Sequence, residues 1–275
     1  MDWLQALIMG VVQGLTEYLP VSSSGHLEIF RTILGIDIPA DETLQFDIIL
    51  HAATVLSTIV VLWPTFSRLC ASFFTFRRDA DFYYVCKILL SCIPVGIVGV
   101  FLKDQVEEFF GGGLTIVGVC LCVTALLLCF AHFSDYIFAA RRMKSASAGR
   151  DIGWADAFVI GCAQAVAVLP GLSRSGTTIA TGILIGDKRD KVASFSFLMV
   201  ILPILGEALL DVGKMISGPA EEAASVSAGC LIIGFLASFL VGCAACRWML
   251  SLVRKGKLVW FAVYCVIMGV ICLLW

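Results

Sequence analysis

The chain has 275 residues, 60% of them apolar, and its mean hydropathy of +0.97 lies far above that of water-soluble domains. This composition excludes a soluble globular fold. A net charge of -2 with scattered basic residues excludes a nucleic-acid-binding surface. We therefore expect an integral membrane protein whose partners are membrane lipids or a lipid-borne substrate. The N-terminus has neither a basic region nor a cleavage site, so we expect no signal peptide.

Six segments are long and apolar enough to cross a bilayer as helices, which takes about 20 residues. They are 44–63, 84–102, 114–134, 192–213, 226–246 and 258–275. Two further apolar stretches, 3–34 and 154–186, are interrupted by helix-breaking clusters at 20–25 and 170–176. Most of the twelve cysteines lie inside apolar runs, and we expect them to pack as small hydrophobic side chains.

The charges of the short loops predict how the chain crosses the membrane, because cytoplasmic loops carry an excess of Lys and Arg. The basic loops are 64–82, 135–153, 187–191 and 247–257, and the mainly acidic loops are 35–43, 103–113 and 214–225. Basic loops lie on both sides of 154–186, so we expect that stretch to be a re-entrant hairpin from the cytoplasmic side. The stretch 3–34 is then a hairpin from the outer side.

Each half of the chain thus contains one hairpin and three spans, an odd number, so the second half lies upside down relative to the first. Several residues recur 151 positions later, namely Gly10 as Gly161, Gln13 as Gln164, Ser22 as Ser173, Ser24 as Ser175, Gly25 as Gly176 and Phe46 as Phe197. The fold predicted is an all-α polytopic membrane protein with two inverted-topology repeats. One membrane domain contains repeats 1–135 and 154–275, joined by a basic cytoplasmic linker at 136–153.

The two breaks are expected to meet inside the protein. Irregular backbone at membrane depth is tolerated only where it is buried in protein or lines a wet cavity. A short helix is predicted to begin after each break, near His26 and near Thr177, so that two helix N-termini point at the midplane. Such ends favour anions, above all phosphate.

The side chains around the breaks suit phosphoryl transfer. Gln13 and Glu17 share a helix face just before the first break. The guanidinium of Arg174, in the second break, offers a fixed fork of donors that matches phosphate oxygens. The catalytic candidates are Glu17, Ser23, His26 and Arg174, and the phosphate-binding candidates are Ser22, Ser24, Gly25, Ser173, Ser175, Gly176, Thr177 and Thr178.

Two long motifs, QGLTEYLPVSSSGH at 13–26 and PGLSRSGTT at 170–178, cover the breaks. They resemble the signature motifs of the undecaprenyl pyrophosphate phosphatases of the bacitracin-resistance type. The likeness extends through 46–51 and runs nearly end to end. It implies removal of the terminal phosphate of undecaprenyl diphosphate, a polyprenyl diphosphate lipid, at the outer face of a bacterial plasma (inner) membrane. That reaction would recycle the lipid carrier for peptidoglycan synthesis.

The resemblance also implies roles for individual residues. The family's acidic motif has Glu or Gln first and Glu second, which corresponds to Gln13 and Glu17. Since Gln13 carries no charge, two carboxylates sharing one metal are disfavoured. Glu17 is then the candidate general base, or the ligand of a divalent cation, Mg²⁺ or Ca²⁺. Arg174 would grip the diphosphate and stabilise transition-state charge.

Three nucleophiles remain open from the sequence: His26, Ser23 and an activated water. His26 is slightly favoured because imidazole is nucleophilic near neutral pH, whereas a serine needs an adjacent base. Asp47 and His51 share a helix face and either support the site or form an interhelical hydrogen bond. Glu207 lies in an apolar span and receives no role.

A transporter or flippase of a phosphorylated lipid or anion is the alternative function, because inverted repeats, broken helices and a midplane anion site also describe transporters. A transporter needs binding groups but no nucleophile, so Glu17 beside His26 favours an enzyme. The second half lacks the acid, since Val168 corresponds to Glu17. The metal requirement, the prenyl chain length and the formation of a homodimer stay open.

Overall fold

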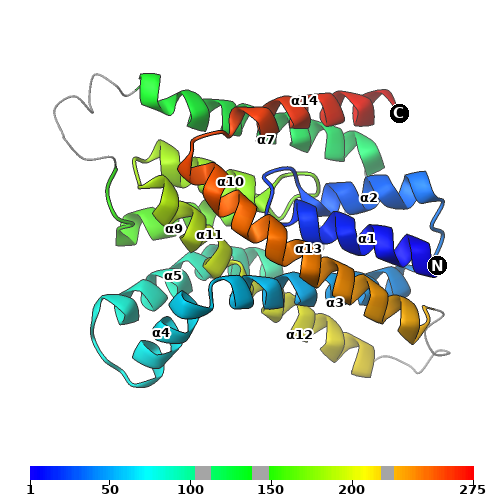
Figure 1. Cartoon of the computed structure of the whole chain (residues 1–275), viewed down its shortest axis with the longest axis horizontal. Coiled ribbons are helices and arrows are strands. Elements are labelled where there is room, and N and C mark those ends of the chain that lie inside the picture. Colours follow the sequence, from blue (N-terminus) through cyan, green and yellow to red (C-terminus); the bar gives the residue numbers. More distant parts are fainter. Residues whose placement is uncertain (103–112, 138–148, 218–225) are drawn as a thin grey trace.

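The computed structural model is all-helical and describes residues 1–102, 113–137, 149–217 and 226–275. In these ranges the only bridge between extended segments joins Arg150 and Asp187, so they contain no sheet. Most of the helices run lengthwise through the molecule (Figure 1). Most of the predicted acidic loops at 103–113 and 214–225, and most of the linker at 136–153, lie outside the described residues. Residues 214–217 of the second acidic loop are helical instead.

In the part of the chain that the structure describes, five segments are long and apolar enough to cross a membrane. They are Glu42–Val61 in α3 (Ala40–Val61), Ala80–Phe101 (α5), Gly113–Ser134 in α7 (Gly113–Ile137), Arg189–Leu210 across α11 (Arg189–Met199) and α12 (Ile201–Ser217), and Ala228–Arg254 (α13). The last predicted span is α14 (Val259–Leu274), an apolar helix of 16 residues that is shorter than the other five. Five of the six predicted spans are therefore confirmed by length and composition.

Both interrupted stretches fold into two helices, as predicted. The first contains α1 (Trp3–Thr16) and α2 (Ser23–Leu34), and the second contains α9 (Trp154–Val166) and α10 (Arg174–Leu184). The two helices of each pair contact each other. In Figure 1 the pair α1 and α2 lies toward the right, where both chain termini lie, and α9 lies toward the left.

The helices after the breaks begin three residues earlier than predicted, α2 at Ser23 and α10 at Arg174. The cause is N-capping, since serine directly before a helix satisfies an amide that has no partner within the helix. The two caps are Ser22 Oγ, which accepts from the amide of Gly25 at 3.3 Å, and Ser173 Oγ, which accepts from the amide of Gly176 at 3.1 Å. Each helix therefore begins about one turn before the residue near which it was expected.

The predicted span 192–213 is two helices, because α11 ends at Met199 and α12 begins at Ile201. Pro203 explains the interruption, since proline lacks the amide hydrogen that would bond to the carbonyl of Met199. The thiol of Cys92 in α5 donates to that carbonyl at 3.5 Å. Cys92 is one of twelve cysteines, all of them free thiols.

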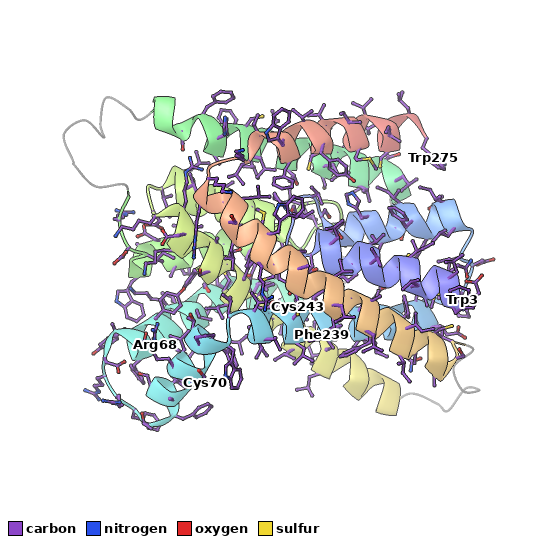
Figure 2. The ribbon with its side chains drawn as sticks, viewed as in Figure 1. Trp3, Arg68, Cys70, Phe239, Cys243 and Trp275 are labelled. Carbon is purple, nitrogen blue, oxygen red and sulfur yellow. The ribbon has the colours of Figure 1, made fainter. Side chains whose placement is uncertain are left out.

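The basic loop predicted at 64–82 contains a helix, α4 (Trp63–Phe74). A proline in its first turn favours helix initiation there. Arg68 of α4 forms an ion pair with Asp81 of α5, with Nε 2.7 Å from Oδ2. Figure 2 labels Arg68 at the end of the molecule opposite Trp3 and Trp275. The two tryptophans are exposed, and tryptophan favours the membrane–water interface.

Glycines let the first helix of each hairpin approach a long helix closely. A Cβ on Gly10 of α1 would lie 2.5 Å from the carbonyl oxygen of Gly234 in α13. A Cβ on Gly161 of α9 would lie 2.4 Å from the carbonyl oxygen of Ser91 in α5. Gly10 and Gly161 are one of the pairs 151 positions apart, so corresponding residues serve the same packing contact in both halves.

Candidate active site

The two helix breaks contact each other, as predicted. Ser175 Oγ in the second break donates to the backbone oxygen of Leu19 in the first at 3.2 Å. A Cβ on Gly176 would lie 3.2 Å from the Cβ of Pro20, so the backbones also approach closely. The contact brings the start of α10 next to the residues that join α1 to α2.

Glu17 lies between the two breaks, and its side chain is only 8% exposed. Its Oε2 accepts hydrogen bonds from Ser23 Oγ at 2.7 Å and from Gln13 Nε2 at 3.0 Å. Arg174 Nη2 lies 3.8 Å from Oε1, and His51 Nε2 lies 3.8 Å from Oε2. One carboxylate thus connects α1, α2, α3 and α10.

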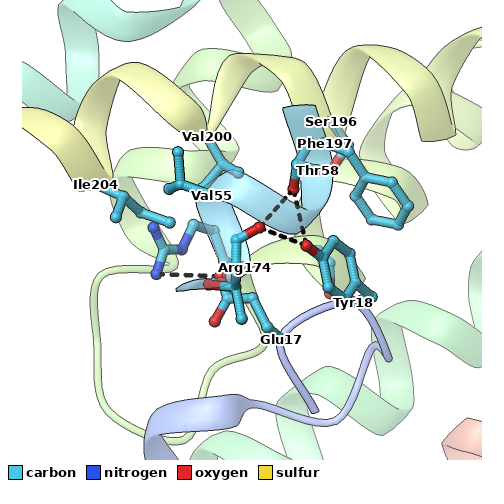
Figure 3. A pocket seen from close by; sticks show the side chains of 11 residues that line it. Glu17, Tyr18, Val55, Thr58, Arg174, Ser196, Phe197, Val200 and Ile204 are labelled. Carbon is cyan, nitrogen blue, oxygen red and sulfur yellow. Dashed lines mark hydrogen bonds and ion pairs between the residues drawn. The ribbon is translucent and has the colours of Figure 1, made fainter. Parts of the chain in front are cut away.

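A small cavity of about 20 Å³ lies beside Glu17 (Figure 3). It is lined by Glu17, Tyr18, Thr54, Val55, Thr58, Arg174, Ser175, Ser196, Phe197, Val200 and Ile204. This volume suffices for about one water molecule. The Arg174 side chain, which contacts Glu17 beside the cavity, is 27% exposed.

A group of hydroxyls on the cavity wall was missed from the sequence. The Tyr18 hydroxyl donates to the Thr54 carbonyl at 2.6 Å and lies 2.9 Å from Thr58 Oγ1 (Figure 3). The available signal was a polar stripe, since Asp47, His51, Thr54 and Thr58 recur every three or four residues within an apolar helix. The stripe runs along the side of α3 that faces the first break.

His26 lies outside this cavity. Its Nδ1 donates to the Ser22 carbonyl at 2.8 Å, and its Nε2 lies 2.6 Å from the hydroxyl of Tyr264 in α14. The two rings stack with centroids 5.6 Å apart. Both ring nitrogens are engaged away from Glu17, whereas Ser23 has the adjacent base that a serine nucleophile needs. The geometry therefore favours Ser23 over His26, although the sequence slightly favoured His26.

Asp47 and His51 differ in their relation to the site. Asp47 forms an ion pair with Arg31 of α2, which also contacts Glu28 at 3.4 Å. An interhelical contact, one of the two predicted alternatives for Asp47, is thus observed. His51 Nδ1 donates to the Asp47 carbonyl at 2.8 Å, and this bond turns Nε2 toward Glu17.

Ser175 is the one predicted phosphate-binding residue that lines the cavity. Thr177 does not line the cavity, and its buried Oγ1 has no hydrogen-bond partner among the described residues. The other predicted residues that do not line the cavity are Ser22, Ser24, Gly25, Ser173, Gly176 and Thr178. Thr178 Oγ1 donates to the Arg174 carbonyl at 2.8 Å and lies 2.6 Å from Ser196 Oγ. Most of the predicted hydroxyls therefore organise the starts of α2 and α10 rather than face the cavity.

The second break has no counterpart of the carboxylate, since Val168 stands where Glu17 does in the first. Gln164 corresponds to Gln13 and is buried, but neither Oε1 nor Nε2 has a hydrogen-bond partner in the described part of the chain. Gln13 instead donates to Glu17. Glu207 of α12 is exposed and does not line the cavity.

Comparison with known proteins yields one family and several curated relatives. The family model described as bacitracin resistance protein BacA matches residues 6–271. An undecaprenyl-diphosphatase of Bacteroides fragilis is 54% identical over 98% of this chain and 97% of its own length. Those of Christiangramia forsetii and Oceanobacillus iheyensis are 43% and 35% identical, over 98% and 97% of this chain and 96% and 94% of their own lengths. These matches confirm the resemblance of the motifs.

The two corresponding glutamines predict opposite effects on stability. Gln164→Leu should raise the thermal unfolding temperature in detergent, because it removes a buried amide without partners, whose burial costs about 1–3 kcal/mol. Gln13→Leu should lower that temperature, because Glu17 loses a hydrogen bond. A Gln164→Leu variant that unfolds below wild type would contradict this expectation and would show that the amide is satisfied.

Proposed function

The chain belongs to the bacitracin resistance protein BacA family, and we propose that it is an undecaprenyl-diphosphatase with Ser23 as its nucleophile. The observation that carries this proposal is the 2.7 Å hydrogen bond from Ser23 to Glu17. A serine is activated by a base within hydrogen-bond reach, and the base is held by a third group. Gln13 is that third group. A transporter needs no such arrangement.

The reaction proceeds in two steps. Ser23 Oγ attacks the terminal phosphorus of undecaprenyl diphosphate, its proton passes to Glu17, and the bond from phosphorus to the bridging oxygen breaks. Glu17 gives that proton to the departing undecaprenyl phosphate. Water then attacks the phosphoserine while Glu17 accepts its proton, and the bond from phosphorus to Ser23 Oγ breaks. Glu17 passes that proton to Ser23 Oγ, so that inorganic phosphate leaves and both residues return to their starting states.

Arg174 holds the terminal phosphate. It begins α10, so its guanidinium and the helix N-terminus both present positive charge to an anion. In the structure its partner is Glu17, 3.8 Å away. The substrate phosphate takes over Arg174 and leaves Glu17 free to accept the proton from Ser23.

We infer that the site opens to the outer side of a bacterial plasma membrane and that the two halves are inverted repeats. The matching serine caps and the matching glycine contacts support the repeat. The ends of α4 and α13 lie at the left of Figure 1, as does the start of α9, and the loops beside them are basic. That end is then cytoplasmic, and the α1 and α2 hairpin reaches the site from the opposite side.

A divalent cation, Mg²⁺ or Ca²⁺, is proposed to bind at Glu17. The described residues contain no group of three His, Cys, Asp or Glu side chains that could hold a metal. Mg²⁺ is commonly bound by one or two carboxylates together with substrate phosphates and several water molecules. The donors of this site fit that mode of binding alone. The buried Gln13 Oε1, which lacks a partner among the described residues, is a second oxygen near Glu17. The ion would neutralise charge on the diphosphate.

Ser23→Ala should lower phosphate release from undecaprenyl diphosphate by at least about 100-fold, because it removes the attacking oxygen. Acid-quenched wild-type protein should carry a phosphate on Ser23 by peptide mass spectrometry. Ser194→Ala, a half-buried serine on α11 that does not line the cavity, is the matched control and should retain wild-type release. A phosphate found on His26, or undiminished release by Ser23→Ala, would overturn Ser23 as the nucleophile.

Reporter fusions test the orientation. An alkaline phosphatase reporter, active only outside the cytoplasm, should be active when fused after Trp275 and inactive when fused after Gly256. The reason is that α14 crosses the membrane between the two positions and the loop that ends near Gly256 is basic. The reverse pattern would place the site on the cytoplasmic side.

Chelation tests the cation. EDTA should lower phosphate release by wild-type protein, and added Mg²⁺ or Ca²⁺ should restore it. Glu17→Gln should bind the cation more weakly in a direct titration with Mn²⁺ as a paramagnetic probe. Full release in EDTA, together with unchanged Mn²⁺ binding by Glu17→Gln, would exclude the proposed cation.

A further inference from the structure

A larger groove lies between the end of α1, α13 and α14 and shares no lining residue with the cavity beside Glu17. Its volume is about 420 Å³, a size common for ligand pockets, which run from roughly 300 to 1,000 Å³. Trp248 and Leu252 line it one turn apart on α13, and Trp260 and Tyr264 line it one turn apart on α14. We call it the α13–α14 groove.

The walls of the α13–α14 groove are mainly apolar, and one charged side chain, Lys257, lines it. Lys257 is exposed and lies two residues before the start of α14. The rings of Trp248 and Trp260 are also exposed, and such rings settle at the level of lipid headgroups. An ammonium group at that level, above apolar walls, complements an amphiphile with a negative headgroup and a hydrocarbon chain.

We propose that the α13–α14 groove binds one anionic phospholipid, with its phosphate at Lys257 and one acyl chain along the apolar walls. The occupant is a lipid of the leaflet at the Lys257 end of the molecule. A lysine near the membrane surface attracts anionic lipids by about 1 kcal/mol. Neither the site nor its occupant depends on the phosphatase reaction.

The groove is also connected to the first helix break. Leu19 and Val21 belong to that break and line the groove. The Tyr264 hydroxyl contacts His26 in the first turn of α2, and the thiol of Cys265 donates to the Pro20 carbonyl at 3.5 Å. A lipid seated in the groove therefore packs against the segment that carries Ser23, and it is expected to stabilise the folded protein.

Native mass spectrometry of the full-length protein in detergent tests the proposal with phosphatidylglycerol and phosphatidylcholine as probes. Wild type should retain one phosphatidylglycerol more tightly than phosphatidylcholine. Lys257→Met should weaken phosphatidylglycerol binding about fivefold, equivalent to the loss of about 1 kcal/mol. Lys255→Met is the matched control, because Lys255 is exposed and does not line the groove, and it should bind as wild type does.

Leu252→Trp, which fills the groove, should weaken the retention of both lipids, and thermal unfolding checks that each variant is folded. Equal retention of the two lipids by wild type would overturn the role of the charge. Unchanged phosphatidylglycerol binding by both Lys257→Met and Leu252→Trp would overturn the site. Because the readout is lipid binding, these outcomes do not depend on whether Ser23 is the nucleophile.

Discussion

Backbone amides that leave a helix inside hydrocarbon must find partners within the protein, and this requirement shapes the centre of the molecule. Each break is closed by a serine cap, and the amide of Ser173 donates to Thr124 Oγ1 of α7 at 3.1 Å. The carbonyl of Leu19 accepts from Ser175 of the other break. Because a side chain of one break is the hydrogen-bond partner of a carbonyl in the other, the two breaks are held in contact. The polar side chains of the candidate site therefore lie where the backbone itself is polar.

The two breaks turn the chain in different ways. The second has its left-handed residue at Gly171, with φ of 84°, where glycine adopts the conformation without strain. The first has φ of 69° at Ser22, a residue with a side chain, which costs on the order of 1–3 kcal/mol. Ser22 directly precedes Ser23, so the strained position places the hydroxyl against Glu17. Backbone strain of this kind persists at functional sites because the surrounding contacts enforce it.

The sequence predicted what local patterns determine: the hairpins, the breaks, and Glu17 and Arg174 as the charged members of one site. It did not predict which candidate nucleophile faces Glu17, because the orientation of His26 depends on Tyr264, which lies 238 positions away in the chain. The interruption between α11 and α12 had a local signal in Pro203. The α4 helix was missed because its mixed composition resembles that of a charged loop, and amphipathic helices at a membrane surface have this pattern.

The pair of Glu17 and Arg174 connects binding to chemistry. Two opposite charges 3.8 Å apart in a mostly buried site attract each other strongly, and separating them without replacement leaves uncompensated charge. In the proposed reaction, the substrate phosphate replaces Glu17 as the partner of Arg174, and the proton from Ser23 neutralises Glu17. The small cavity in the structure is consistent with this exchange, because the ion pair occupies the space that the substrate needs. The proposed mechanism thus frees Glu17 to act as the base only when a phosphate arrives, which ties the activation of Ser23 to the presence of the substrate.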